Sequence, residues 1–162
     1  ASLQAAEYPD AWSAEGPFGQ VRGQVATYLS APVRLEPVLA LRAGGQKAWG
    51  NYPFFDAATL GGGSMLRGWR QERFAGDASI YGTAELRLFL TRFFLVLPGD
   101  LGAFGLADAG RVYVSGESSD TWHTGFGGGL WVSFLGRGNT LSVSMAHGRE
   151  GDAVYFRSGM PF

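Results

Sequence analysis

The chain has 162 residues, 26 of them glycine, with 17% charged and 14% aromatic residues and a formal net charge of -1. This length predicts a single domain, residues 1–162, and the balanced charge excludes the basic surface of a nucleic-acid-binding protein. Soluble domains carry about 25% charged residues, yet no apolar run here reaches the length of about 18 residues that a transmembrane helix needs. A membrane β-barrel reconciles the low charge with a mean hydropathy of +0.00, because its strands show lipid only alternate residues.

Apolar and polar residues alternate along most of the chain, which is the period of β-strands. The clearest segment is 77–90, where Leu86 falls on an apolar face and Glu85 and Arg87 fall on the opposite face. Charges opposite a purely apolar face suit a wall with lipid outside and a polar lumen inside. Eight strands are predicted, at about residues 2–8, 19–29, 33–43, 77–90, 102–114, 125–134, 140–146 and 154–162.

The predicted connections alternate in length. Short links are expected at 30–32, 98–100 and 136–139, and longer ones at 9–17, 44–76, 115–122 and 148–152. This asymmetry is typical of outer-membrane barrels whose short turns face the periplasm, which puts both termini there. Since no signal peptide follows Ala1, we expect a mature or trimmed chain, or a piece of a longer one.

The fold prediction is therefore all-β: a transmembrane antiparallel up-and-down β-barrel of eight strands in a Gram-negative-type outer membrane. The alternative is a soluble, lipocalin-like barrel. It is disfavoured because the charged residues lie on the face that a soluble barrel would bury.

Three motifs stand on or between these strands. Arg67-Gly68-Trp69 lies in the long loop, Asp108 lies among small residues in Gly105–Gly110, and Glu85-Leu86-Arg87 lies on the strand after the loop. In these motifs the chain resembles the carboxy-terminal half of the bacterial surface antigen family, the outer-membrane assembly and transport superfamily that includes BamA, TamA and the two-partner secretion transporters. The loop motif is similar to the family's V-R-G-F/Y, with Leu66 for Val and Trp69 for the aromatic residue. Asp108 matches the family's inner-wall F/G-x-D-x-G, and Glu85 and Arg87 match its E-x-R strand.

Physical chemistry predicts a loop-to-wall lock from these residues. The planar guanidinium of Arg67 can hold a carboxylate such as Asp108 away from bulk water. Gly68 permits a backbone geometry that a Cβ forbids, and Trp69 fills space against the wall. Glu85 and Arg87 share the inward face and can pair with each other or across strands. Two alternatives stay open: Arg67 pairs instead with Glu85, or it lies outside as a solvated side chain. Further inward charges could join the network or line water: Arg22, Arg34, Glu36, Arg42 and Arg157.

The final strand carries a second family feature. Phe156, Met160 and the terminal Phe162 alternate on its apolar face. This ending resembles the signal by which such barrels are themselves inserted. The resemblance implies membrane lipid or detergent and the barrel assembly machinery as partners.

The chain departs from the family in size. Full members have sixteen strands and usually periplasmic domains that receive client chains. Eight strands enclose only side chains, so the barrel either closes with the loop as a lid, which we favour, or pairs with a second copy or a missing half-barrel to make sixteen. Two functions follow: outer-membrane protein insertion or transport, and a structural anchor with a filled lumen.

A rim-located outer-membrane enzyme is the least favoured function. His123 and His147 fall near predicted strand ends, with Ser118, Ser119, Asp120, Glu150 and Asp152 nearby. A histidine near a carboxylate on a loop is usually only solvated, so we expect no enzyme and no catalytic residue. Two separated histidines and no cysteine predict no metal site, and Gly61–Ser64 lacks the lysine of a phosphate loop, so no cofactor is expected.

Overall fold

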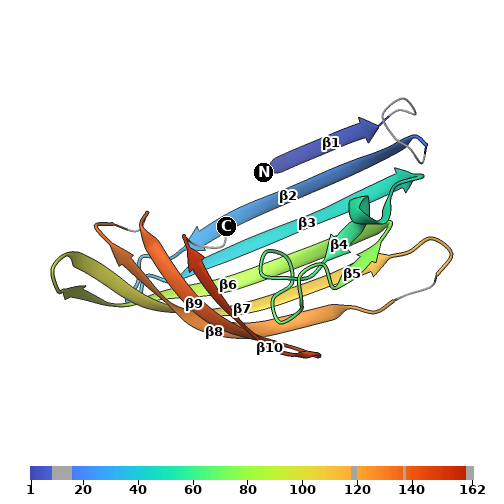
Figure 1. The fold of residues 1–162 in the computed structure, drawn as a ribbon. Coiled ribbons are helices and arrows are strands. Elements are labelled where there is room, and N and C mark those ends of the chain that lie inside the picture. The colour runs from blue at the N-terminus through green and yellow to red at the C-terminus, as the bar shows by residue number, and fades with distance from the viewer. Residues whose placement is uncertain (9–15, 118–119, 137, 160–162) are drawn as a thin grey trace.

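The computed structural model describes residues 1–8, 16–117, 120–136 and 138–159, which are mostly β-strands (Figure 1). The main sheet has eight strands in the order β1-β2-β3-β6-β7-β8-β9-β10, and neighbouring strands are antiparallel. Its strands are β1 (Ser2–Tyr8), β2 (Phe18–Ser30), β3 (Val38–Gly50), β6 (Ala78–Phe94), β7 (Pro98–Tyr113), β8 (His123–Phe134), β9 (Thr140–Gly148) and β10 (Gly151–Ser158). The 3₁₀ helix η2 (Phe54–Asp56) and the small sheet of β4 (Ala58–Leu60) and β5 (Phe74–Gly76) belong to the connection between β3 and β6. Among the described residues no helix is long and apolar enough to cross a membrane.

The main sheet has two chemically different faces. On β6, Glu85 is 1% exposed and Arg87 8% exposed, whereas Leu86 between them is 47% exposed. Side chains alternate between the two faces along each β-strand, and paired residues on neighbouring strands share a face. The two faces of β6 therefore continue onto β3 and β7. We call the face of Glu85 the inner face and the face of Leu86 the outer face. Exposed apolar side chains gather on the outer face: Val25, Leu29, Ile80, Leu86, Phe126, Leu130, Leu141, Val143, Met145, Val154 and Phe156.

The predicted closed barrel is not formed. The sheet ends at β1 on one side and β10 on the other, and these two strands are not paired in the described part of the chain. An eight-stranded barrel has room only for side chains. Here the inner face also holds the connection 51–77, whose Leu60 and Leu66 are both 0% exposed. The loop thus takes up space at the inner face that a closed eight-stranded barrel would not offer.

Several predicted boundaries also change. The third strand begins at Val38, because Leu35 and Glu36 have positive φ angles of 74° and 40° in the turn 31–37. Arg34 and Glu36 are therefore exposed in this turn and do not lie on the inner face. The predicted turn 98–100 lies within β7, and the turn is at 95–97. The expected longer loop 148–152 is only the short turn 149–150.

The connections define two ends of the sheet. The turns 31–37 and 95–97 lie at one end together with residues 135–136 and 138–139, and we call it the short-turn end. The connection 51–77 and the turn 149–150 lie at the opposite end, the long-loop end. One buried cluster on the sheet contains Phe104, Leu106, Trp131 and Ala146, and a second, formed with the loop, contains Leu60, Leu66 and Trp69.

Candidate functional site: a loop locked to the wall

The connection 51–77 leaves β3, runs along the inner face and returns to β6 (Figure 1). Its two ends are tied together by the Tyr52 hydroxyl, which donates to the Asp77 carboxylate. The backbone N–H of Ser115 donates to the same carboxylate. The hydrogen bond from Tyr52 lowers the pKa of Asp77, while burial raises the pKa of Tyr52 to about 12. The base of the loop is thus fixed to the β7–β8 connection.

Glycines shape the part of the loop that reaches the wall. Gly61, Gly62 and Gly68 have φ angles of 130°, 82° and 86°, a region that L side chains rarely adopt. A Cβ on Gly68 would lie 2.6 Å from the backbone nitrogen of Gly148. A Cβ on Gly125 of β8 would lie 1.9 Å from the carbonyl oxygen of Arg67. The loop backbone therefore approaches β8 and β9 more closely than any side chain would allow.

Arg67 is the centre of the site. Its Nε donates to Oδ2 of Asp108 at 2.7 Å and its Nη2 donates to Oδ1 at 2.6 Å. Its backbone N–H donates to the same carboxylate at 2.9 Å, and its Nη1 donates to Glu85. Arg67 is 3% exposed and Asp108 4% exposed. The guanidinium thus joins the loop to β6 and β7 together, so the two pairings weighed from the sequence both occur.

Arg87 completes the charge arrangement. Its Nε and Nη2 donate to Oε2 of Glu85 at 3.0 and 2.8 Å. Four charges therefore alternate in sign, in the order Arg87, Glu85, Arg67, Asp108, within a buried region. Removing charges from water costs several kcal/mol per ion, and the pairing and hydrogen bonding of each charge here offset that cost. We call this cluster the lock.

Gly68 and Trp69 anchor the loop to strands that the sequence did not indicate. The Gly68 N–H donates to the Tyr155 hydroxyl of β10 at 2.9 Å. The Trp69 indole N–H donates to the Thr124 carbonyl of β8 at 2.9 Å. The sequence offered two signals here: the alternation that points Tyr155 inward, and the glycine-rich run 125–129. Neither signal identifies a contact with the loop.

The other inward arginines contribute less to the lock. A guanidinium nitrogen of Arg42 donates to the Ser64 carbonyl of the loop. Arg157 lies beside the loop, where a Cβ on Gly63 would be 2.6 Å from its Nη2. Arg22 is exposed on the inner side of β2. Of the two alternatives left open for these residues, Arg42 and Arg157 lie against the loop, whereas Arg22 is exposed.

A second group of contacts holds the loop at the long-loop end. The Arg73 Nε donates to both carboxylate oxygens of Glu150, at 2.8 and 2.9 Å. This bond lowers the pKa of Glu150. The Phe74 ring stacks on His123 with 3.7 Å between centroids and 16° between planes. These contacts join the loop to β8 and to the β9–β10 turn.

The described residues that were considered for catalysis take part in separate contacts. His147 lies 2.7 Å from Asp152 through its Nδ1, while His123 stacks on Phe74. Asp120 pairs with Arg111 at 2.7 Å, and Glu150 pairs with Arg73. Ser118 and Ser119 lie outside the described residues. Within the described residues, no group of three His, Cys, Asp or Glu is placed to hold a metal ion.

The proposed insertion signal is only partly described. Phe156 is 81% exposed on the outer face of β10. Met160 and Phe162 lie outside the described residues.

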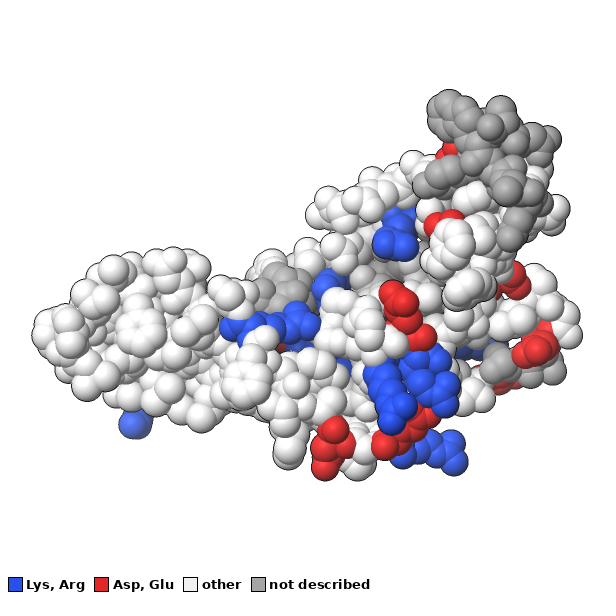
Figure 2. All heavy atoms as spheres, in the orientation of Figure 1, with Lys and Arg blue, Asp and Glu red and all other residues white. Residues whose placement is uncertain are grey.

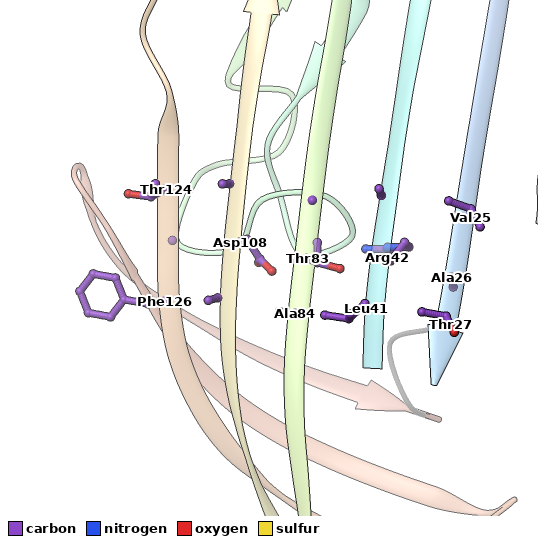
Figure 3. Close-up of a pocket in the computed structure, with 15 residues that line it drawn as sticks. Val25, Ala26, Thr27, Leu41, Arg42, Thr83, Ala84, Asp108, Thr124 and Phe126 are labelled. Carbon is purple, nitrogen blue, oxygen red and sulfur yellow. The ribbon is translucent and has the colours of Figure 1, made fainter. Parts of the chain in front are cut away.

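Small side chains lie on the outer face of the sheet behind the lock. A shallow hollow of about 650 Å³ crosses β2, β3, β6, β7 and β8 beside Asp108, Thr83 and Arg42 (Figure 3). Its outer-face lining includes Ala43, Ala84, Ala107 and Ala109. The lock therefore lies one sheet thickness from the outer surface.

Comparison with known proteins finds no matching family model, curated protein or solved structure. The function proposed for the chain therefore depends on the geometry of the lock and on the two faces of the sheet.

Proposed function

We propose that this chain forms the wall of an outer-membrane β-barrel that takes part in inserting or transporting outer-membrane proteins. The observation that carries the proposal is the buried lock of Arg67 with Asp108 and Glu85, built from the residues that resemble the assembly-factor motifs. Such a loop would close the lumen while its charges are paired and open it when they separate.

The chemistry of the two faces supports a membrane location. Met145 is 56% and Phe126 59% exposed on the outer face, whereas Glu85 and Asp108 are buried on the inner face. A soluble sheet would cover its apolar face and expose its charges. Lipid around the outer face removes this contradiction. The short-turn end would then face the periplasm.

The two edges of the sheet, which have no partner strand among the described residues, support a partner that completes the wall. Open sheet edges do not occur in hydrocarbon, because their backbone groups have no partners there. β1 has 7 residues and β10 has 8, and they run in opposite directions because they are the ends of an eight-stranded meander. A second copy or another half-barrel can therefore pair antiparallel with both edges and keep its short turns on the same side. The completed wall would have about sixteen strands, enough to enclose a loop.

The structural anchor is the second candidate, and a specific observation favours it. Leu60 and Leu66 are 0% exposed and Trp69 is 6% exposed, so the loop fills the space beside the lock with apolar side chains. A permanently filled lumen would hold the protein in the membrane without passing a client.

The two candidates differ in what the lock does. The test adds an unfolded outer-membrane polypeptide, the client, to vesicles that contain the protein and the partner that completes its wall. Insertion is measured as the fraction of client that becomes protected from external protease. The transport proposal predicts faster client insertion than in empty vesicles, and a changed rate for Arg67→Ala. Arg73→Ala, which breaks an exposed loop contact, is the matched control and should keep the parent rate. Equal rates in empty and loaded vesicles would leave the anchor as the function.

A further inference from the structure

The β6–β7 hairpin extends beyond its neighbour at the short-turn end. β6 has 17 residues, but β3 pairs with it only from Lys47↔Ala78 to Val38↔Arg87. The final segment of β6, residues 90–94, pairs with β7 through residues such as Thr91↔Leu101. No strand of the described chain pairs with the other side of this segment. We call that side the hairpin edge.

The hairpin ends in an apolar group, residues 94–97, which we call the hairpin tip. Phe94 is 75%, Leu95 78% and Val96 88% exposed. Figure 2 shows that charged side chains gather over the loop and the long-loop end, while the hairpin end of this view carries almost none. Clusters of large exposed apolar side chains on a protein usually mark a surface that binds something.

Neither water nor lipid satisfies both parts of this hairpin. Lipid would cover the tip, but it offers no hydrogen bonds to the unpaired N–H and C=O groups of the hairpin edge. Water would bond the edge but leave the tip exposed. An extended polypeptide with apolar side chains satisfies both, because its backbone pairs with the edge and its side chains cover the tip.

We propose that the hairpin edge and tip bind an extended apolar polypeptide segment, which adds to β6 as a further strand. The edge spans about 17 Å at the usual strand rise, enough for about five residues of a partner strand. Arg92 is the only charged residue of segment 90–94, and it is paired with Asp100 at 3.0 Å. An uncharged partner strand therefore fits the edge better than an acidic one.

The source of that segment rests on the proposed function. If the short-turn end faces the periplasm, an unfolded outer-membrane polypeptide arrives on this side, and such chains consist of strands with alternating apolar residues. The hairpin would then be a first contact for a client before it reaches the wall.

The binding test uses a peptide of about nine residues that alternates valine and threonine, the length of one membrane strand. A photo-crosslinking group replaces Thr91 on the edge, and peptide binding is measured with the protein in detergent. Val96→Glu should weaken binding about tenfold, because burying one valine side chain contributes on that order. The matched control is Leu135→Glu in the β8–β9 turn, where Leu135 is 65% exposed at the same end. This control should leave binding unchanged.

Three results would overturn the proposal: equal binding by Val96→Glu and the parent protein, equal loss in both variants, or absence of crosslinking from position 91. A fourth measurement uses a spin label at position 96. Oxygen accessibility as high as in the bilayer interior would also overturn the proposal, because lipid would then cover the tip. Peptide binding without client insertion in vesicles would refute the transport function while leaving this binding site in place.

Discussion

Replacing Arg67 by alanine should strongly destabilise the folded chain. The change removes two charge-assisted hydrogen bonds to Asp108, at 2.7 and 2.6 Å, and leaves that carboxylate buried with only the backbone N–H of residue 67. Glu85 loses one donor but keeps Arg87 at 2.8 Å. Most of the penalty therefore falls on Asp108. Breaking a buried pair in this way costs about 3–5 kcal/mol.

The double variant separates a buried pair from two independent contacts. Asp108→Ala added to Arg67→Ala removes the orphaned carboxylate and leaves Glu85 with Arg87. The free energy of unfolding of the double variant should therefore be equal to or higher than that of Arg67→Ala alone, and not lower by the further loss of the second single variant.

Urea titration in detergent, followed by tryptophan fluorescence, measures these free energies. Arg73→Ala is the control for losing an arginine from the loop. The Arg73 and Glu150 side chains are 45% and 37% exposed, so breaking this pair should lower the free energy of unfolding much less than Arg67→Ala does. Additive single-variant effects, or equal small losses for Arg67→Ala and Arg73→Ala, would refute the lock.

Four further predictions concern other parts of the chain. Gly68→Ala should cost about 1–3 kcal/mol, because the φ angle is 86° and a Cβ would lie 2.6 Å from Gly148; an unchanged urea midpoint would contradict this. The Tyr52 hydrogen bond lowers the pKa of Asp77 below its usual value of 3.8, so its stabilisation is complete above that value and is lost as the pH falls through the lower folded value. Asp77→Asn should therefore flatten the acid side of the stability profile, and an unchanged slope would refute the assignment. Deleting Phe162 should reduce insertion in cells much more than refolding in detergent, and equal losses would reject a signal role. The folded protein should migrate differently on gels before and after boiling; identical migration would argue against a stable membrane sheet.

Periodicity gave the strand count of the main sheet and the faces of β6 and β7 correctly, and the reason is local. Glu85, Arg87 and Asp108 each stand between apolar or small neighbours, so a period of two assigns their side of the sheet without knowledge of the fold. The main sheet has the eight strands predicted, in a simple antiparallel order.

The errors came from features that alternation does not encode. The residues from Val33 to Glu36 alternate like a strand, but the positive φ angles of Leu35 and Glu36 place them in a turn. Pro98-Gly99-Asp100 has the composition of a turn, yet it begins β7, because its pairing with β6 continues to Phe94↔Pro98 and its pairing with β8 to Gly99↔Phe134. Closure of the sheet into a barrel depends on how much of the connection 51–77 lies at the inner face. A pattern of neighbouring residues carries no information about that.

The site was predictable in its charges and not in its apolar and backbone contacts. Arg67, Asp108 and Glu85 could be grouped because an arginine in a lumen needs carboxylates. Tyr155 and Thr124 could not be grouped with the loop, because their contacts depend on how far the sheet curls. The same curl brings Gly148 against Gly68.

The central claim is that lipid covers the outer face of this sheet. The chain has no cysteine, so single spin labels can be placed along β9 at residues 141–145 and compared for oxygen and polar-reagent accessibility in lipid vesicles. We expect a period of two, with high oxygen accessibility at Leu141, Val143 and Met145 and low accessibility at Ser142 and Ser144. Uniform accessibility along β9, or a monodisperse folded protein in plain buffer with the outer residues accessible to polar reagents, would contradict it.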